Sequence, residues 1–195
     1  MSAKAEQKER THEEILRTAA KLLRRRGVAG ARVADVMAGA GLTVGGFYAH
    51  FRSKEALVDE TLRRTSRELR ATLFAGLEHK PAADRAEVVL KRYLSASHRD
   101  HPESGCPFPS IVGEIASHHD EHQPVFAEQL SALVDELQPL LPGRQARTLA
   151  VGLAALMYGG LSMARALGKT DLSDEVLRAC RAVGRLALTN ERGKP

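Results

Sequence analysis

The chain has 195 residues and is 43% apolar, which is enough for a buried core and argues against a disordered chain. Aromatic residues make up only 4%, and no apolar run alternates with a period of two, so the composition favours an all-α protein. Residues 1–70 contain 15 Lys and Arg against 9 Asp and Glu, whereas residues 71–195 contain 14 against 15. This asymmetry suggests a part that binds a polyanion, joined to a near-neutral part with another role.

Cysteine usage and the chain ends indicate where the protein acts. Cys106 and Cys180 lack the spacing of a metal or redox motif, and the N-terminal residues contain no apolar signal-peptide core. We therefore expect a reduced, cytoplasmic protein. Residues 148–164 carry no charge, but this stretch is shorter than the ~20 apolar residues that a bilayer requires. We interpret it as a buried helix and expect no membrane association.

The N-terminal elements follow one another closely. A capping box that starts at Thr11 precedes an apolar run at helical spacing, and Gly27 is expected to end this first helix. A short second helix is predicted over residues 32–40, and Gly41 breaks it. Thr43 then occupies the N-cap position of a third short helix. A helix, a tight turn containing glycine and another short helix form the helix-turn-helix signature.

The rest of the chain also has helical patterns. Ser53 and Ser173 are the expected N-caps of the first and last of these helices, and a Pro-rich segment at 98–109 interrupts the series. The predicted helices cover residues 53–77, 83–97, 110–118, 124–140, 144–167 and 173–188. We predict an N-terminal three-helix domain over residues 1–52 and a larger helical domain over residues 53–195.

The third helix carries the candidate DNA contacts, because the N-terminal residues of a recognition helix meet base edges. Phe47 is expected to lie in the core, whereas Tyr48 suits the core and a phosphate contact equally well. Residues that can reach bases or bring the backbone close to DNA are Thr43, Val44, Gly45 and Gly46. Side chains that can donate to phosphate oxygens are those of Arg32, Tyr48, His50 and Lys54.

Residues 10–57 resemble the N-terminal domain of the TetR family of bacterial transcriptional regulators. The resemblance rests on Val33-x-x-Val36, Ala40-Gly41-Leu42, Gly45-Gly46-Phe47-Tyr48-x-His50-Phe51 and Ser53-Lys54-Glu55-x-Leu57. It implies that residues 43–46 read bases and that Tyr48, His50 and Lys54 hold phosphates. Three positions depart from the usual pattern, namely Arg32, Met37 and Ala49, and the last two leave the operator sequence open.

The resemblance also implies a homodimer built through the last two helices and a small-molecule effector pocket in the helical domain. The candidate dimer residues are Leu149, Leu153, Leu156, Gly160, Val176, Cys180, Val183 and Leu186. The candidate pocket residues are Tyr93, Cys106, Phe108, Ile111, Phe126, Met157 and Tyr158. Packing within one subunit is the alternative for both sets, and Cys106 is either a sensor thiol or inert.

The segment His118–His122 contains three histidines, of which His118 and His122 have i, i+4 spacing. Because Pro124 makes an unbroken helix doubtful there, we expect a solvated helix end and no metal site. We expect no cofactor, and no nucleophile–base pair at interpretable spacing indicates an enzyme. The leading hypothesis is a repressor that a small ligand releases from a palindromic operator. The alternatives are an activator or architectural DNA binder without a ligand, and a helical enzyme.

Overall fold

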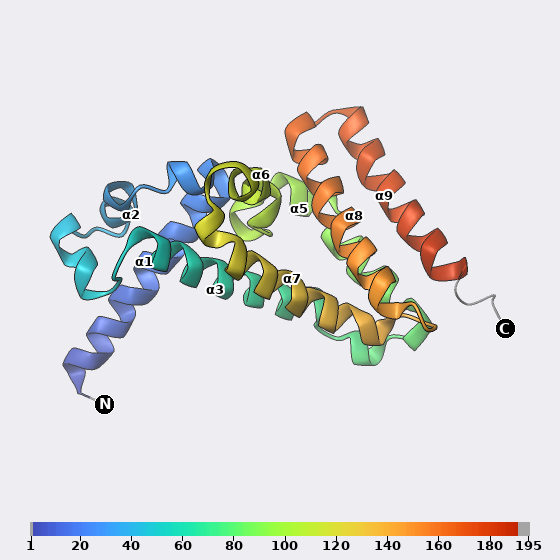
Figure 1. Cartoon of the computed structure of the whole chain (residues 1–195), viewed down its shortest axis with the longest axis horizontal. Helices are drawn as coiled ribbons and strands as arrows, with labels where there is room; N and C mark the ends of the chain where they lie inside the picture. The colour runs from blue at the N-terminus through green and yellow to red at the C-terminus, as the bar shows by residue number, and fades with distance from the viewer. Residues whose placement is uncertain (1, 191–195) are drawn as a thin grey trace. The chain divides into compact units, whose positions relative to one another are not determined.

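The computed structural model describes residues 2–190, which form helices joined by short connections, without a strand in this range (Figure 1). The all-α fold predicted from the sequence is therefore confirmed. The α-helices are α1 (Ala3–Gly30), α2 (Val33–Gly39), α3 (Lys54–Phe74), α4 (Arg85–Tyr93), α5 (Ala96–Asp100), α6 (Phe108–His118), α7 (Gln123–Leu137), α8 (Ala146–Leu167) and α9 (Asp171–Asn190). Short 3-10 segments are η1 (Val44–Ala49), η2 (Leu77–His79), η3 (Ala82–Asp84), η4 (Pro102–Ser104), η5 (Asp120–His122) and η6 (Gln138–Leu140).

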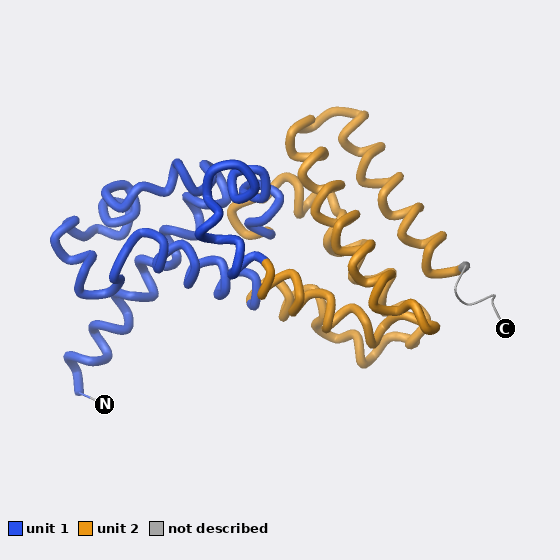
Figure 2. The backbone as a smooth tube through the Cα atoms, viewed as in Figure 1, with its two compact units in different colours: residues 1–67, 106–126 blue, residues 68–105, 127–195 orange. Residues whose placement is uncertain are grey.

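The chain divides into two compact units, and each unit is assembled from two separated segments (Figure 2). Unit 1 comprises residues 1–67 and 106–126, and unit 2 comprises residues 68–105 and 127–195. The predicted division after residue 52 lies inside unit 1. That unit extends into α3 and also takes in α6, a helix distant in the sequence.

Unit 1 has a small apolar core that holds α1, α2, η1 and the start of α3 together. α1 packs against α2 and against α6, so it contacts helices on both sides of the sequence gap. The buried core residues are Ile15, Leu16, Ala19, Val36, Met37, Phe47, Phe51 and Leu57. Each fully buried Leu, Ile, Phe or Met side chain contributes about 1.5–3 kcal/mol relative to an exposed one.

The start of α1 differs from the prediction. The helix begins at Ala3, where the Ser2 hydroxyl accepts a hydrogen bond from the Ala5 amide at 3.3 Å. Thr11 is therefore no N-cap, and its hydroxyl instead donates to the Gln7 carbonyl one turn earlier at 3.0 Å. The predicted end is confirmed in its essential point, because Gly27 has φ 70° and breaks the helical backbone.

The first helices of unit 2 also differ from the prediction. The expected helix over 83–97 is interrupted, since α4 ends at Tyr93 and α5 begins at Ala96. Ser95 separates the two helices, and its hydroxyl caps α5 by accepting from the His98 amide at 3.1 Å. The sequence spacing did not show this break, because no proline or glycine marks it.

In unit 2, α8 packs along α9, and α4 contacts both helices. Ser173 is buried in the first turn of α9 and is not its cap, because the Thr170 hydroxyl accepts from the Ser173 amide at 3.2 Å. The Ser173 hydroxyl instead donates to the Ala164 carbonyl at 2.8 Å and accepts from the Arg99 guanidinium at 2.9 Å. Ser173 therefore joins α8 to α9, and the predicted N-cap role is wrong.

Among the described residues, α8 is the helix long and apolar enough to cross a bilayer by length and composition alone. Its buried residues face α9 and the helices beside it within unit 2. A core helix passes the same test of length and composition, so this property is weak evidence for a membrane span.

Candidate nucleic-acid interface

A tight turn connects α2 to η1 and sets the direction of the second helix. Gly41 has φ 72°, and its amide donates to the Ala38 carbonyl at 3.0 Å, while the Leu42 amide donates to the Met37 carbonyl at 2.8 Å. These two bonds form a Schellman motif, in which a glycine adopts the left-handed conformation after the helix end. The predicted break at Gly41 is confirmed, and η1 follows as a 3-10 helix with Thr43 before it.

Two phenylalanines fix η1 to the core of unit 1, as the sequence predicts for Phe47. Phe47 and Phe51 are 1% and 3% exposed, and their ring centroids lie 5.7 Å apart. His12 of α1 stacks on Phe51 at 4.5 Å, and its Nε2 lies 2.6 Å from a carboxylate oxygen of Glu60 on α3. Because its inward face is held from both sides, η1 presents a fixed outer face.

The outer face of η1 consists of the residues predicted to meet DNA. Thr43, Gly45 and Gly46 are exposed, and Thr43 makes no capping hydrogen bond with its side chain. Val44 is 49% exposed and Tyr48 is 74% exposed, although both are large apolar or aromatic side chains. This exposure excludes the core interpretation of Tyr48, since a core position would bury the ring, and its phosphate contact stays a prediction.

Neither glycine of η1 is required by the fold of unit 1. A Cβ at Gly45 would find no heavy atom within 4 Å, and a Cβ at Gly46 would lie 3.8 Å from Met37 Cε, an ordinary contact. Both residues have negative φ, so their backbone conformation does not favour glycine either. The two glycines therefore leave space outside the chain, which is what a close backbone approach to another molecule requires.

Cationic and polar side chains flank this face on both sides. Arg32, which precedes α2, is exposed and forms an ion pair with Asp35, with Nε 2.9 Å from the carboxylate oxygen. This pairing raises the pKa of the Arg32 guanidinium and orients it. Lys54 opens α3, where the Ser53 hydroxyl caps the helix by accepting from the Ala56 amide at 3.2 Å. The predicted cap at Ser53 is thus confirmed.

His50 is less exposed than the sequence suggests, because it is half-buried at the end of η1. Its Nδ1 atom is buried without a hydrogen-bond partner, and its ring centroid lies 5.8 Å from that of His12. Burial lowers the pKa of His50, and the nearby charges of His12 and Lys8 lower it further. The lowered pKa favours the neutral imidazole, which can donate one hydrogen bond to a phosphate oxygen.

One residue that holds this unit together was not found from the sequence. Glu114 of α6 reaches the end of α1, where its carboxylate accepts a hydrogen bond from the Ala29 amide at 3.0 Å. A Cβ at Gly27 would lie 1.6 Å from the same carboxylate, so Gly27 is needed both for its positive φ and for this contact. An i, i+4 or motif spacing could not reveal the pair, since 85 residues separate Ala29 from Glu114.

The candidate effector residues fall into one group in each unit. In unit 1, Cys106 and Ile111 are buried, and the rings of Phe108 and Phe126 meet edge to face at 5.0 Å. In unit 2, Met157 is buried, and the ring centroids of Tyr93 and Tyr158 lie 6.0 Å apart. Their role in binding a ligand stays a prediction.

Two of the candidate dimer residues on α8 pack inside the subunit, and the others are half-buried. Leu153 is 2% exposed and Gly160 is buried, and a Cβ at Gly160 would lie 2.7 Å from Cys180 Sγ. These two positions pack α8 against α9 within one subunit and are not available to a partner. Burial also raises the pKa of the Cys180 thiol. Leu149, Leu156 and Val176 are half-buried.

A different apolar face of α8 and α9 is exposed. On α9, Val183 is 55% exposed and Leu186 is 61% exposed, as the predicted dimer face requires. On α8, Val151 and Met163 are 46% and 62% exposed, whereas Leu153 is buried. The outward surface of α8 therefore includes Val151 and Met163 and not Leu153.

The folded core and the exposed face of η1 define a helix-turn-helix protein with an all-helical body. Residues 15–61 match the sequence profile described as "Bacterial regulatory proteins, tetR family". The chain thus carries, over residues 15–61, the N-terminal domain of the TetR family of bacterial transcriptional regulators.

Two curated relatives and a solved structure show the extent of the similarity. The HTH-type transcriptional repressor KstR2 from Rhodococcus jostii is 34% identical over 89 residues, which is 44% of this chain and 44% of KstR2. This match thus spans less than half of either protein. The HTH-type transcriptional regulator BetI from Escherichia coli is 28% identical over 141 residues, 68% of this chain and 71% of BetI.

The crystal structure of a TetR-family transcriptional regulator from Cytophaga hutchinsonii superposes with a TM-score of 0.80. The superposition covers 100% of this chain and 99% of that chain at 20% sequence identity. At this identity the likeness concerns the fold. It extends over the helical body, where the sequence resemblance to the family is limited to length and helical layout.

Proposed function

We propose that this protein binds a palindromic DNA operator as a homodimer, represses transcription there, and is released by a small-molecule effector. The observation that carries the proposal is the pair Gly45 and Gly46, exposed on a fixed helix and not required by the packing around them. The chain's similarity to KstR2, a transcriptional repressor, and to BetI, a transcriptional regulator, supports the same function.

The chemistry of the face suits a DNA groove. Without side chains at positions 45 and 46, the backbone amides at the start of η1 can come close to phosphate oxygens, which the positive end of a helix attracts. Val44 offers an apolar surface for a thymine methyl. Tyr48, Arg32 and Lys54 can donate to phosphates on either side, so most contacts position the protein and few select bases.

DNA binding is tested by fluorescence anisotropy with a fragment from the promoter region of the protein's own gene. We expect nanomolar-range binding that weakens steeply with salt, and two protected half-sites about one helical turn apart or a multiple of it. A fragment with one half-site scrambled is the control. Binding that ignores the half-site sequence, or no binding at low salt, contradicts the proposal.

Dimerisation is proposed through the exposed apolar faces of α8 and α9. Leu172, Val176, Val183 and Leu186 recur on one side of α9, and residues of this kind on two helices per subunit suit a four-helix seam. The double variant Val183→Glu/Leu186→Glu should be monomeric by analytical ultracentrifugation at micromolar concentration. Arg178→Glu, an exposed charge change on the same helix, should stay dimeric. A monomeric unmodified protein contradicts the proposed seam.

An in vitro transcription assay on the identified promoter distinguishes a repressor from an activator. Repression predicts less transcript when the protein is added, and recovery when the low-molecular-weight fraction of a cell extract releases the DNA. More transcript on addition of protein favours an activator. The similarity to TetR-family regulators supports DNA binding in the cytoplasm as the role of this protein, rather than catalysis.

A further inference from the structure

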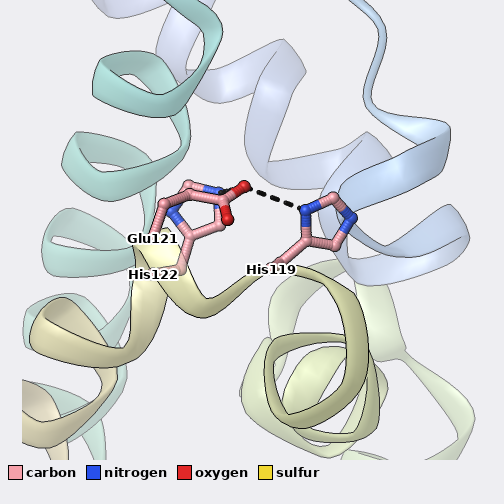
Figure 3. A group of neighbouring side chains, drawn as sticks. All are labelled: His119, Glu121 and His122. Atoms are coloured by element: carbon pink, nitrogen blue, oxygen red, sulfur yellow. Dashed lines mark hydrogen bonds and ion pairs between the residues drawn. The ribbon is translucent and has the colours of Figure 1, made fainter.

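The segment between α6 and α7 places three potential metal ligands side by side (Figure 3). His119, Glu121 and His122 come from η5 and the residue before it, and one donor atom from each lies within 4.8 Å of the others. The pair with i, i+4 spacing, His118 and His122, is not the pair that meets, and His118 is exposed. The group belongs to unit 1.

A single carboxylate oxygen of Glu121 lies between the two imidazoles. It is 3.0 Å from His119 Nδ1 and 3.7 Å from His122 Nε2. Two ligands of one tetrahedral zinc ion, with bonds of about 2.0–2.1 Å, are about 3.3 Å apart. The two measured separations lie on either side of that value, so small side-chain movements would bring all three donors onto one ion.

His122 is oriented as a metal-binding histidine usually is. The ring is 1% exposed, and its Nδ1 lies 2.7 Å from a carboxylate oxygen of Asp59 on α3. An ionised carboxylate only accepts hydrogen bonds, so Nδ1 must hold the proton and donate it to Asp59. The lone pair of a neutral ring is then on Nε2, the atom that faces Glu121. A carboxylate that orients the far nitrogen of a histidine in this way is the usual outer partner of a histidine ligand.

With Nδ1 directed to Asp59, Nε2 is the His122 atom that can bind a cation beside the Glu121 oxygen. We propose that His119, Glu121 and His122 bind a divalent ion of the zinc type, with water in the fourth position and Asp59 as the positioning residue. Two imidazoles and one carboxylate suit Zn²⁺ and Co²⁺ better than Mg²⁺ or Ca²⁺, which prefer oxygen ligands.

The test uses the untagged full-length protein, stripped with a chelator and titrated with Co²⁺ and then Zn²⁺. One equivalent of Co²⁺ per chain should give the visible d–d absorption of tetrahedral Co²⁺, and Zn²⁺ should abolish it. At a Zn²⁺ concentration a hundred times the Kd, the melting temperature should rise by about 5–10 °C. A protein that shows no saturable Co²⁺ absorption and no thermal shift overturns the site.

Variants assign the ligands. Glu121→Gln and His119→Gln replace partly exposed side chains and should weaken Zn²⁺ binding by a hundredfold or more, with unchanged far-ultraviolet circular dichroism. Asp59→Asn should weaken it by about 10–100-fold and keep the tetrahedral spectrum, because it removes no ligand. His118→Gln, an exposed histidine next to the site, is the matched control and should change neither. Equal affinity in Glu121→Gln, or an equal loss in His118→Gln, overturns the assignment.

Discussion

Replacing Gly45 with alanine should raise the stability of the protein while weakening its binding to DNA. The added Cβ meets no heavy atom within 4 Å, so nothing in the folded chain opposes it. Alanine in place of glycine in a helix adds about 0.5–1 kcal/mol, which corresponds to a melting temperature higher by about 1–4 °C. On DNA the methyl group holds the backbone away, and losing one hydrogen bond from an amide to a charged phosphate costs about 1.5–3 kcal/mol. The expected loss of affinity is therefore about tenfold to a hundredfold per half-site.

The assay pairs thermal unfolding with fluorescence anisotropy on the operator and on a scrambled fragment. Gly113→Ala is the matched control, because Gly113 lies in helix α6 of the same unit and a Cβ there also meets nothing within 4 Å. It should raise the melting temperature similarly and leave DNA affinity unchanged. Gly45→Leu should weaken binding to all fragments together. The reasoning is refuted if Gly45→Ala binds DNA as tightly as the unmodified protein, or if its preference among operators changes at undiminished affinity.

Three further predictions test other features of unit 1. Gly27→Ala should lower the free energy of unfolding in a urea titration by about 1–3 kcal/mol, because alanine is strained at φ 70° and its Cβ meets the Glu114 carboxylate. Adding Glu114→Ala to the same chain removes that clash and should restore part of the lost free energy. Arg32→Ala should weaken binding to specific and scrambled DNA alike and reduce the slope of log affinity against log salt by about one; an unchanged slope excludes a phosphate contact. Stability should fall as the pH decreases through the ordinary His range near 6.5, because the pKa of His50 is lowered in the folded state and the unfolded chain takes up the proton first. His50→Gln should make urea midpoints between about pH 5 and 8 less dependent on pH, and an equal dependence would exclude His50 as the cause.

Local patterns in the sequence predicted the local parts of the fold. Gly41 ends α2 because a left-handed residue is needed there, and Phe47 is buried because its spacing from the next phenylalanine matches one side of a helix turn. Ser53 caps α3 as expected. The failures have equally local causes. A capping box at Thr11 is also a sequence that a continuing helix tolerates. The cap of α9 is Thr170, three residues before the predicted Ser173.

Contacts between distant segments were beyond sequence reasoning. The bond from Glu114 to the end of α1 and the bond from Asp59 to His122 join residues that no periodicity relates. The histidine-rich segment shows the difference most clearly. Spacing alone selected His118 and His122, whereas the turn of η5 brings His119 and Glu121 to His122 instead. The exposure of the α8 face that includes Met163 was likewise decided by which side packs on α9.

The assembly of unit 1 from residues 1–67 and 106–126 has a consequence for how the protein is made. During synthesis, Gly27 is complete long before Glu114 exists, and at about 5–20 residues per second the second segment follows residue 67 by ~3–12 s. The nascent helix-turn-helix lacks part of its own support until most of the chain has been translated. A recombination breakpoint just after residue 67 would divide one folded unit between two genes. Exchange of the whole body between relatives at that point would therefore disrupt unit 1, whereas point substitutions leave its two segments together.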